Sequence, residues 1–395
     1  MLNANKKTPQ DTVTTWVDML VDKAIKLRAS DIHLEPRRDG FVILFRIDGM
    51  IHTIETLRPH QHKAINSRIK VMANLDITVV NIPQDGQFEH TKESSRISLR
   101  VSTYPTIYGE ALVLRILNRS ASLLKMESLG LDEKQLKILK EMIQYPHGMI
   151  MITGPSGSGK TTLLYSIINL LNTGDKNIIT VEDPVEQRMD GVRQGQMSQA
   201  KKFDFVTAVR SILRQDPDII MVGEIRDKET ARISSQAALT GSLVLSTFHT
   251  LDIFAVITRL LEMGVPRSII GHAINGVITT RLVRKICTSC QIPYKPTSEE
   301  MKMIGAHDMS KARFLTGEGC DKCRGGGYYG RIGLFEILAF DKEIRSLITE
   351  QDIISETFYS FERTKAKGLG ESGLDKVFAG ITTIEEVLRV TGKLS

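Results

Sequence analysis

Hydrophobic and polar residues follow two patterns along residues 1–118. Over residues 12–27 and again over residues 62–74, apolar side chains recur every three or four positions, which is typical of amphipathic helices. Elsewhere in this region apolar and polar residues alternate one by one, as they do in strands that bury one face. The strands expected on this basis are residues 31–35, 41–47, 51–54, 95–103 and 111–117. The pattern predicts a small N-terminal α+β domain that ends near residue 118.

A polar connection over residues 119–133 leads to a region with a different pattern. Short runs that are apolar throughout alternate there with helix-like segments such as 134–144 and 162–171, which is the signature of a parallel α/β sheet. The apolar runs are residues 149–153, 178–181, 219–222 and 243–246, and each ends in a polar cluster. Because ligands collect beyond the carboxyl ends of parallel strands, we expect these clusters to converge on one ligand. Residues 134–286 are the predicted core domain.

The first polar cluster has the form G-x-x-x-x-G-K-T, from Gly154 to Thr161, between an expected strand and an expected helix. In such a loop, glycines let backbone N–H groups point inward, and the following helix presents its positive end to the phosphates. Lys160 supplies a mobile charge for the outer phosphates, and Thr161 offers its hydroxyl to Mg²⁺. A glycine-rich turn that binds nothing is the weaker alternative, so we expect ATP and Mg²⁺ as ligands. The residues expected to bind the nucleotide are Gly154, Ser156, Gly157, Ser158, Gly159, Lys160, Thr161, Thr162 and Asp183.

Hydrolysis of a nucleoside triphosphate needs a metal holder, a group that orients water, and positive charge for the transition state. Glu224 follows the expected strand 219–222 in a Walker B layout, and we assign it to the metal and the water. Glu182 and Asp183, at a neighbouring strand end, form a second acidic site that binds Mg²⁺ through its waters or shares the role of base. Capping of the next helix is the alternative for both acidic sites. For His249 we favour a sensor of the terminal phosphate over a purely structural hydrogen bond, and we do not expect a base.

Four cysteines, Cys287, Cys290, Cys320 and Cys323, form two C-x-x-C pairs with 29 residues between them. In a reducing compartment this spacing favours a tetrahedral zinc site, and a redox pair or four unrelated thiols are the weaker alternatives. The expected zinc module spans residues 287–333, and a C-terminal helical region follows over residues 334–395. Helices are expected at residues 254–263, 269–283, 344–366 and 383–390.

Bulk composition changes this picture little. The chain has 395 residues, enough for two or three domains, and 52 Lys plus Arg against 46 Asp plus Glu give a mild net charge of +6. That charge neither demands nor excludes nucleic acid or anionic lipid. No apolar run approaches the roughly 20 residues that span a bilayer, and the start MLNANKKTPQ lacks the apolar core of a signal peptide. We therefore expect a cytoplasmic protein with no direct membrane span.

Several short signatures follow one another along nearly the whole chain. They are ASDIHLEP (residues 29–36), RIDG (46–49), RVST (100–103), the phosphate-binding loop (154–162), TVEDPVE (180–186), GEIRD (223–227) and residues 239–252. With the cysteines, this order resembles the secretion ATPases that power type II secretion and type IV pilus assembly in bacteria. The resemblance implies a RecA-like P-loop NTPase core and a homo-hexamer that couples ATP hydrolysis to assembly of a pilus or pseudopilus. It also implies two partners, a polytopic inner-membrane platform protein and a docking protein on the cytoplasmic face, which would hold the ring peripherally at the inner membrane.

Arg100 and Arg115 match the arginines with which the small domain of this family reaches the nucleotide, although a surface salt bridge is their default interpretation. The sequence departs from the family at Ser242, where histidine is common, and at Gln87, where arginine is frequent. The chain also begins close to the small domain, whereas assembly members usually carry a further N-terminal domain. Retraction ATPases of type IV pili lack the cysteine module, so the cysteines favour assembly or secretion over retraction.

Two other functions stay open at this point. A RecA-like core with a net charge of +6 is compatible with translocation along nucleic acid, but aromatic residues do not interleave with basic ones as they do where bases stack. Nucleic acid is therefore not an expected partner. A scaffold that binds ATP and recruits partners without productive turnover is the other alternative, and Glu224 decides between scaffold and motor.

Overall fold

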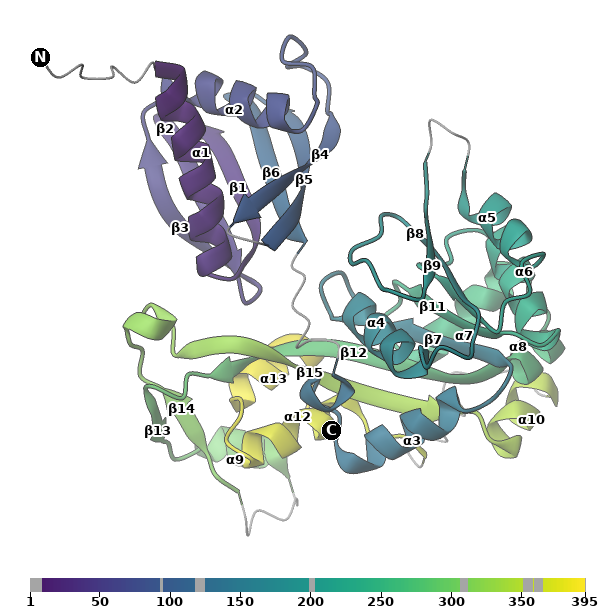
Figure 1. Cartoon of the computed structure of the whole chain (residues 1–395). Coiled ribbons are helices and arrows are strands. Elements are labelled where there is room, and N and C mark those ends of the chain that lie inside the picture. Colours follow the sequence, from purple (N-terminus) through teal and green to yellow (C-terminus); the bar gives the residue numbers. More distant parts are fainter. Residues whose placement is uncertain are drawn as a thin grey trace, which may run out of the picture. The chain divides into compact units, whose positions relative to one another are not determined.

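The chain divides into two compact units, Met1–Arg119 and Ser120–Ser395, in the computed structural model of the protein (Figure 1). The structure describes residues 9–92, 95–117, 125–198, 203–305, 312–350, 358 and 365–394. Each unit has its own sheet and its own hydrophobic core.

The N-terminal unit is an antiparallel sheet with two helices on one face (Figure 1). Its strand order is β3-β2-β1-β6-β5-β4. The bounds are β1 Ala29–Arg37, β2 Gly40–Ile47, β3 Met50–Leu57, β4 Asp85–Lys92, β5 Ser95–Thr106, β6 Gly109–Leu117, α1 Pro9–Lys26 and α2 Gln61–Met72. Alternate strand residues such as Ile32, Leu34 and Leu114 pack with Val17 and Ile69 of the helices. The predicted α+β fold is confirmed, and β4, which carries few apolar side chains, is the strand without a predicted counterpart.

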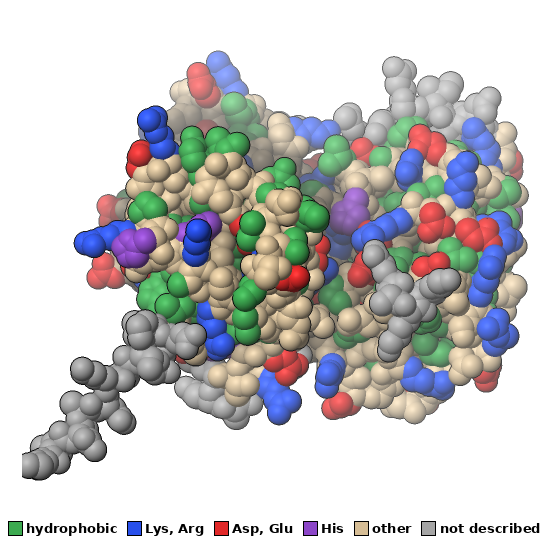
Figure 2. Space-filling view, turned by 90° about the horizontal axis from the view of Figure 1, so that it is seen from above, with side chains coloured by type: hydrophobic (Ala, Val, Ile, Leu, Met, Phe, Trp, Pro, Cys, Tyr) green, Lys and Arg blue, Asp and Glu red, His purple; other side chains and the backbone are tan. Residues whose placement is uncertain are grey.

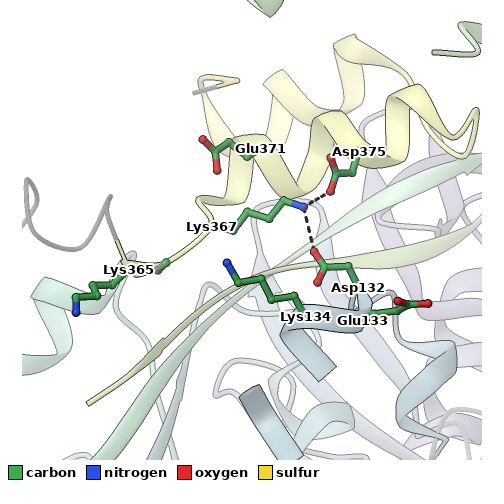
Figure 3. A pocket seen from close by; sticks show the side chains of 8 residues that line it. Asp132, Glu133, Lys134, Lys365, Lys367, Glu371 and Asp375 are labelled. Atoms are coloured by element: carbon green, nitrogen blue, oxygen red, sulfur yellow. Dashed lines mark hydrogen bonds and ion pairs between the residues drawn. The ribbon is translucent and has the colours of Figure 1, made fainter. Parts of the chain in front are cut away.

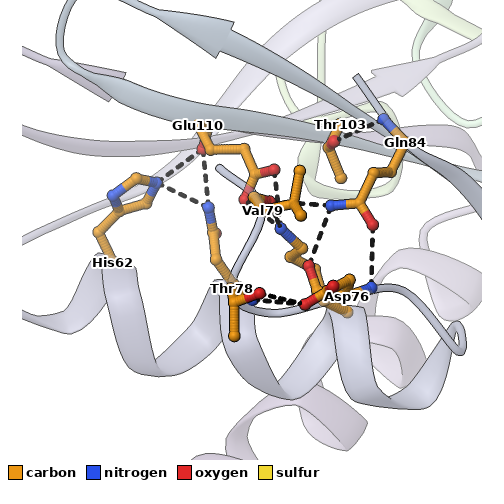
Figure 4. Close-up of polar contacts among 9 residues, drawn as sticks. His62, Asp76, Thr78, Val79, Gln84, Thr103 and Glu110 are labelled. Atoms are coloured by element: carbon orange, nitrogen blue, oxygen red, sulfur yellow. Dashed lines mark hydrogen bonds and ion pairs between the residues drawn. The ribbon is translucent and has the colours of Figure 1, made fainter. Parts of the chain in front are cut away.

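A buried ion pair ties the loop before β4 to the rest of this unit (Figure 4). Lys70 of α2 is 1% exposed, and its ammonium group donates to the carboxylate oxygens of Glu110 at 3.0 and 3.1 Å and to the carbonyl oxygen of Val79 at 2.6 Å. The side-chain amide of Gln84 donates to the same carbonyl oxygen at 2.9 Å, and its backbone N–H donates to the Thr103 hydroxyl at 3.0 Å. Because the lysine charge is paired and hydrogen-bonded, its burial is tolerated, and the loop is held against β5 and β6.

The C-terminal unit is built on a mostly parallel sheet in the order β15-β12-β7-β11-β10-β8-β9 (Figure 1). The bounds are β7 Gly148–Thr153, β8 Ile178–Glu182, β9 Arg193–Gln196, β10 Ile219–Val222, β11 Leu243–Phe248, β12 Ile274–Ile286 and β15 Tyr328–Ala339. Neighbouring strands are parallel except β12 and β15, which are antiparallel. The parallel α/β core expected from the sequence is therefore confirmed.

Helices cover both faces of this sheet. Their bounds are α3 Glu133–Ile143, α4 Lys160–Leu171, α5 Phe205–Ile212, α6 Lys228–Leu239, α7 Ile253–Glu262 and α8 Arg267–Ala273. On β7, Ile150 and Ile152 share a core with side chains of α3 and α4, whereas Met149 and Met151 share a second core with side chains of α5, α6 and α7. A strand that is buried on both faces is apolar throughout, which explains the continuous runs in the sequence.

The expected helix over residues 269–283 is wrong. α8 ends at Ala273, and Ile274 begins β12, which runs between β7 and β15. The first seven positions of β12 are all buried, so its apolar run has no period that separates a buried strand from a buried helix. β-branched residues such as Val277 and Thr279 favour the strand, and they are the signal that identifies it.

The last part of the chain adds a hairpin, further helices and the antiparallel edge strand β15. The bounds of the remaining elements are β13 Gln291–Pro293, β14 Leu315–Gly317, α9 Ser298–Ile304, α10 Lys342–Glu350, α12 Leu369–Phe378 and α13 Ile384–Thr391. β15 runs across position 333, where we expect the cysteine module to end, and into the core sheet. α10 lies at the start of the expected helix 344–366, of which residues 351–357 and 359–364 fall outside the described residues. α13 corresponds to the expected helix 383–390, and α12 has no predicted counterpart.

A pocket of about 730 Å³ lies between the start of α3 and α12 (Figure 3). Lys367 reaches across it, because its ammonium group donates to a carboxylate oxygen of Asp132 at 3.0 Å and to the carboxylate of Asp375. Asp132 also caps α3 by accepting a hydrogen bond from the backbone N–H of Gln135 at 2.8 Å. Acidic and basic side chains pair with one another in this pocket, and these contacts link the start of α3 to α12 within the C-terminal unit.

The molecular surface carries charges of both signs. Figure 2 shows lysine and arginine side chains interspersed with aspartate and glutamate on the face that it presents. That face has no broad field of one sign, in keeping with the mild net charge of +6. Within the part of the chain that the structure describes, no helix has both the length and the apolar character of a membrane span.

Candidate nucleotide-binding site

The expected phosphate-binding loop connects β7 to α4. Gly154 opens the loop with a φ of +147°, and a Cβ at this position would lie 2.6 Å from the carbonyl oxygen of Thr280 on β12. Gly159 is the N-cap of α4, with a φ of +98°. Glycine suits both positions, and the first N–H groups of α4, which have no partner within the helix, are available to an anion. The Ser158 hydroxyl bonds the Thr280 hydroxyl at 3.0 Å, which anchors the loop to β12.

The other predicted loop residues differ in exposure. Ser156 and Gly157 are exposed at the tip of the loop, whereas Ser158 is buried. Thr161 and Thr162 are half-buried in the first turn of α4. The Thr161 hydroxyl therefore belongs to the same helix N-terminus that would receive the phosphates.

Lys160 is folded against the loop. Its ammonium group donates to the carbonyl oxygens of Gly154 at 2.7 Å and Pro155 at 3.0 Å, and it lies 3.4 Å from Nδ1 of His249. The side chain is almost completely buried, and this burial lowers the pKa of Lys160 to about 8 against the opposing effect of Glu224. The lysine charge is thus concentrated at the loop, where the outer phosphates are expected.

Charged and titratable side chains continue from Lys160 across the ends of neighbouring strands. His249 Nε2 lies 3.4 Å from one carboxylate oxygen of Glu224, and the other carboxylate oxygen accepts a hydrogen bond from Arg226 at 2.5 Å. Arg226 in turn lies 3.7 Å from a carboxylate oxygen of Asp183. We call these five residues the charge line. It joins segments that follow β7, β11, β10 and β8, so the predicted convergence of polar clusters at this edge of the sheet is confirmed.

His249 links the lysine to the carboxylate. Burial and the charge of Lys160 lower the pKa of His249, whereas Glu224 opposes this effect. A lowered pKa keeps the imidazole neutral at pH 7. The tautomer with its hydrogen on Nε2 accepts from Lys160 and donates to Glu224, which satisfies both contacts. This arrangement suits a residue that transmits a change at Lys160 to Glu224 rather than a base.

Glu182 is not part of the charge line. It is the last residue of β8 and is buried, and its carboxylate accepts hydrogen bonds from the Tyr165 hydroxyl, from the Thr180 hydroxyl at 2.6 Å and from the side-chain amide of Gln194 at 3.2 Å. Burial raises the pKa of Glu182, and these hydrogen bonds oppose the shift. Because Glu182 still belongs to the strand, its side chain lies on the sheet face of Thr180 and α4, whereas Asp183 lies beyond the strand end. These contacts do not support the expected role of Glu182 in binding Mg²⁺ or in acting as a base.

Further residues of this site have no predicted role, although Arg226 and Thr250 lie within two of the family signatures, GEIRD (223–227) and residues 239–252. Arg226 connects the two carboxylates of the charge line, a contact that the signature GEIRD does not by itself indicate. Arg281 of β12 donates to the carbonyl oxygen of Leu251 at 2.8 Å. The Thr153 hydroxyl, at the end of β7, lies 2.7 Å from both the carbonyl and the hydroxyl oxygen of Thr250. These contacts fix the segment after β11, which carries the histidine of the charge line, against β7 and β12.

Arg100 and Arg115 lie in the N-terminal unit, directly opposite each other on β5 and β6. Arg115 Nε donates to Asp31 at 2.9 Å, so the default salt bridge does exist for this arginine. Arg115 is nevertheless 65% exposed, and Arg100 is exposed as well. Among the described residues, the guanidinium group of Arg100 has no hydrogen bond or ion pair. Both arginines therefore present their charge to solvent on the same sheet.

The four cysteines come together in the C-terminal unit. Three pairs of Sγ atoms lie 3.7–3.9 Å apart, and all four lie within 4.8 Å of one another. Zinc bound tetrahedrally at Zn–S distances of about 2.3 Å places its sulfurs about 3.8 Å apart, so the cluster fits zinc. Backbone hydrogen bonds join the loops that carry the two pairs, because the N–H of Cys287 donates to the carbonyl oxygen of Gly327 at 2.9 Å and the N–H of Glu318 donates to that of Cys290 at 3.1 Å. The cysteines are Cys287, Cys290, Cys320 and Cys323, and no disulfide joins them.

A phosphate-binding loop between a buried parallel strand and a helix, with a carboxylate after a nearby strand, defines a P-loop nucleoside triphosphatase. Comparison with known proteins narrows this class. The model of the family described as "Type II/IV secretion system protein" matches residues 6–389. The chain belongs to this family.

Named relatives agree with this assignment. The type II secretion system protein E of Pseudomonas aeruginosa is 42% identical over 377 residues, which are 95% of this chain and 74% of that protein. The type IV pilus assembly ATPase PilB of Thermus thermophilus is 42% identical over 378 residues, 95% of this chain and 42% of that protein. The crystal structure of the pilus retraction motor PilT with bound ADP matches with a TM-score of 0.64 and 26% identity, and covers 95% of this chain and 96% of that chain. The chain is accordingly an ATP-hydrolysing enzyme with the predicted fold class.

Proposed function

We propose that the chain is the ATPase motor of a type II secretion system or of a type IV pilus assembly machine. In this proposal a homo-hexameric ring couples ATP hydrolysis to the growth of a pseudopilus or pilus. The observation that carries the proposal is the charge line, in which a single imidazole separates the phosphate-binding Lys160 from the Walker B carboxylate of Glu224. This geometry supports ATP hydrolysis as well as ATP binding, because the carboxylate that can orient the attacking water lies close to the lysine that can bind the phosphates.

The charge line and the loop suggest a division of roles. Lys160 and the N–H groups at the start of α4 bind the phosphates, and Glu224 orients the attacking water. Thr161 and Asp183 are the proposed holders of Mg²⁺, Thr161 through its hydroxyl and Asp183 through waters of the ion. Bound Mg²⁺ would neutralise charge on the outer phosphates. His249 then reports the position of Lys160 to Glu224.

Arg100 and Arg115 are proposed to place positive charge at the terminal phosphate in the transition state. Their exposed, adjacent guanidinium groups on one sheet support this role. The charge that develops on the transferred phosphoryl oxygens is the kind that arginine stabilises well.

The cysteine cluster is proposed to hold one structural zinc ion per chain. Cys287 directly follows β12, and the second pair lies shortly before β15, so zinc would join the ends of two neighbouring strands. The cysteine module also favours a motor that assembles a fibre or drives secretion over a motor that retracts a pilus. The proposed partners are a polytopic inner-membrane platform protein and a docking protein on the cytoplasmic face, which would place the ring peripherally at the inner membrane.

The substitution Glu224→Gln tests the motor directly. We expect ATP turnover of the purified protein to fall about 100-fold or more with ATP binding retained, because the water loses its orienting carboxylate. Fibre growth or secretion should be lost in cells that carry the variant in place of the wild type. The matched control is Glu229→Gln on α6, where the carboxylate pairs with Arg210 and Arg232 on the surface.

The outcomes separate the alternatives. Unchanged turnover and unchanged assembly in the Glu224→Gln variant would contradict the motor. Lost turnover with normal assembly would favour a scaffold that only binds ATP. Turnover that depends on DNA and disappears at moderate salt would favour a motor that moves along nucleic acid.

A further inference from the structure

Charged side chains form one row across the sheet of the N-terminal unit. Arg46 on β2, Asp31 on β1, Arg115 on β6 and Arg100 on β5 pair in register from strand to strand. Directly opposite residues of antiparallel strands point to the same face, with Cβ atoms about 4.5–5.5 Å apart. Apart from Ser30, where the pairing of β1 with β2 shifts register, the residues next to them in sequence face the core beneath α1 and α2. The row, which we call the arginine row, therefore lies on the other face of the sheet.

The arginine row carries more positive charge than the fold requires. Three arginines and one aspartate leave a charge of +2. Arg100 and Arg115 are directly opposite, and like charges in that position destabilise a sheet. Within the described residues no carboxylate pairs with Arg100. An excess of positive charge that gains nothing from the fold suits a surface that binds an anion.

Asp31 holds two arginines of this row through its buried carboxylate. It is 5% exposed, and one of its carboxylate oxygens accepts a hydrogen bond from Arg115 Nε at 2.9 Å. The other oxygen accepts a hydrogen bond from the Ser30 hydroxyl at 2.8 Å and lies 3.7 Å from Arg46 Nε. Both arginines thus approach Asp31 with Nε, the nitrogen nearest the backbone. The terminal amino groups of Arg115 stay on its exposed end, where they can bind two oxygens of an anion.

We propose that Asp31 is a positioning residue for ATP hydrolysis, whose buried carboxylate orients Arg115 and Arg46 so that they and Arg100 receive the terminal phosphate as one anion site. This inference rests on the proposed catalytic role of Arg115. It adds Arg46 as a third phosphate-binding arginine and assigns Asp31 a role that acts only through its neighbours. An arginine that is already oriented has less conformational freedom to lose when the transition state forms.

The test is Asp31→Asn in the full-length protein, measured by steady-state ATP turnover. The amide oxygen of asparagine still accepts a hydrogen bond, but it no longer attracts the guanidinium groups by charge. We expect kcat to fall about 10- to 100-fold, since small displacements of catalytic groups have effects of this size. The KM for ATP should change by less than about threefold, because the interaction acts mainly in the transition state. Asp31→Glu, which keeps the charge, should recover part of the activity.

The matched control is Asp48→Asn. Asp48 accepts a hydrogen bond from Arg28 at 2.9 Å in the same unit but outside the arginine row, and its φ of +50° is one that asparagine adopts well. We expect this variant to keep wild-type turnover. Thermal unfolding of all variants identifies any that lose the fold.

A double-mutant cycle separates positioning from a purely structural effect. Because Asp31 is proposed to act through both Arg115 and Arg46, Asp31→Asn should change kcat by less than about twofold in a background that carries Arg115→Ala together with Arg46→Ala. Full multiplication of the two effects would overturn the inference and indicate a structural role. If Arg115→Ala slows turnover but Asp31→Asn does not, the inference is wrong while the proposed function of Arg115 stands. If Arg115→Ala itself has no effect on turnover, the proposed function of Arg115 fails, and the inference fails with it.

Discussion

The substitution Glu386→Gln is expected to loosen the attachment of α13 to β12 at the base of the cysteine module. Glu386 is completely buried, and its carboxylate accepts hydrogen bonds from the backbone N–H and the guanidinium group of Arg284 at 3.0 and 2.5 Å. It accepts two more from Arg389 at 2.7 and 2.9 Å. Arg284 lies on β12 three residues before Cys287. Glutamine in place of the glutamate leaves both guanidinium groups without their counter-charge, which is costly below the surface.

The magnitude follows from the pKa of Glu386. Burial acts to raise this pKa, but the hydrogen bonds from Arg389 and Arg284 outweigh burial and lower it to about 2. Relative to an ordinary glutamate pKa of about 4.3, the difference corresponds to about 3 kcal/mol of stability. Because the folded-state pKa lies below the unfolded one, this contribution is fully present above about pH 5 and is lost as the pH falls toward 2.

Hydrogen exchange of the amides in Ile384–Thr391, measured on the full-length protein, reports the local stability of α13. We expect the protection factors at pH 7 to fall about 100-fold in the Glu386→Gln variant, which corresponds to about 3 kcal/mol. Glu385→Gln is the matched control, because it removes an exposed neighbour in the same turn and should change protection by less than about threefold. Equal protection in the two variants would refute the reasoning.

The same assay tests the pH dependence. Acidification from pH 5 to about 3 should lower protection more in the wild type than in Glu386→Gln, after correction for intrinsic exchange rates. Any loss of zinc at low pH affects both proteins, so the difference between them is the informative quantity. A parallel decrease in both proteins would exclude Glu386 as its cause.

Two further outcomes are expected. Lys160→Ala should weaken ATP binding about 10- to 100-fold in calorimetric titration, because a charged hydrogen-bond donor is removed from the phosphates. An unchanged Kd would contradict the assignment of the loop. The double variant Cys287→Ser with Cys320→Ser should lose one zinc ion per chain in elemental analysis and should unfold at a lower temperature. The metal site would be ruled out if wild-type protein, purified from cells grown with added zinc, contained no zinc.

Local patterns made much of the site predictable from the sequence. The phosphate-binding loop needs glycines at fixed spacing between a strand and a helix, and Glu224 needs only an apolar strand before it, so both positions follow from neighbouring residues. His249 could be placed at the same edge because strands in a parallel α/β sheet end on one side. The cysteine spacing likewise predicts the cluster, whose Sγ atoms the fold brings within 4.8 Å of one another.

The remaining features depend on spatial relations that local patterns do not encode. Glu182 is the last residue of β8, and Asp183 is the first residue beyond it. This one step determines that the carboxylate of Glu182 lies on a face of the sheet, whereas the carboxylate of Asp183 lies at the end of the strand. Arg226 lies 3.7 Å from the carboxylate of Asp183, a residue that is distant in sequence. The two side chains meet only because β10 neighbours β8 in the sheet. β12 could not be separated from a helix by periodicity, because its first seven positions are all buried and the alternation expected of a strand with one exposed face is missing.

The distribution of charge between the two units gives a physical reason to link hydrolysis with movement. In the charge line, with the imidazole neutral, Lys160 and Arg226 are balanced by Glu224 and Asp183. A triphosphate with bound Mg²⁺ carries about two negative charges, which the loop N–H groups and the N-terminus of α4 offset only in part. The arginine row holds a surplus of +2 in the other unit. The carboxylate of Glu224 and the surplus positive charge thus belong to separate units, so under the roles proposed above for Glu224 and Arg115 the transition state needs a group from each unit.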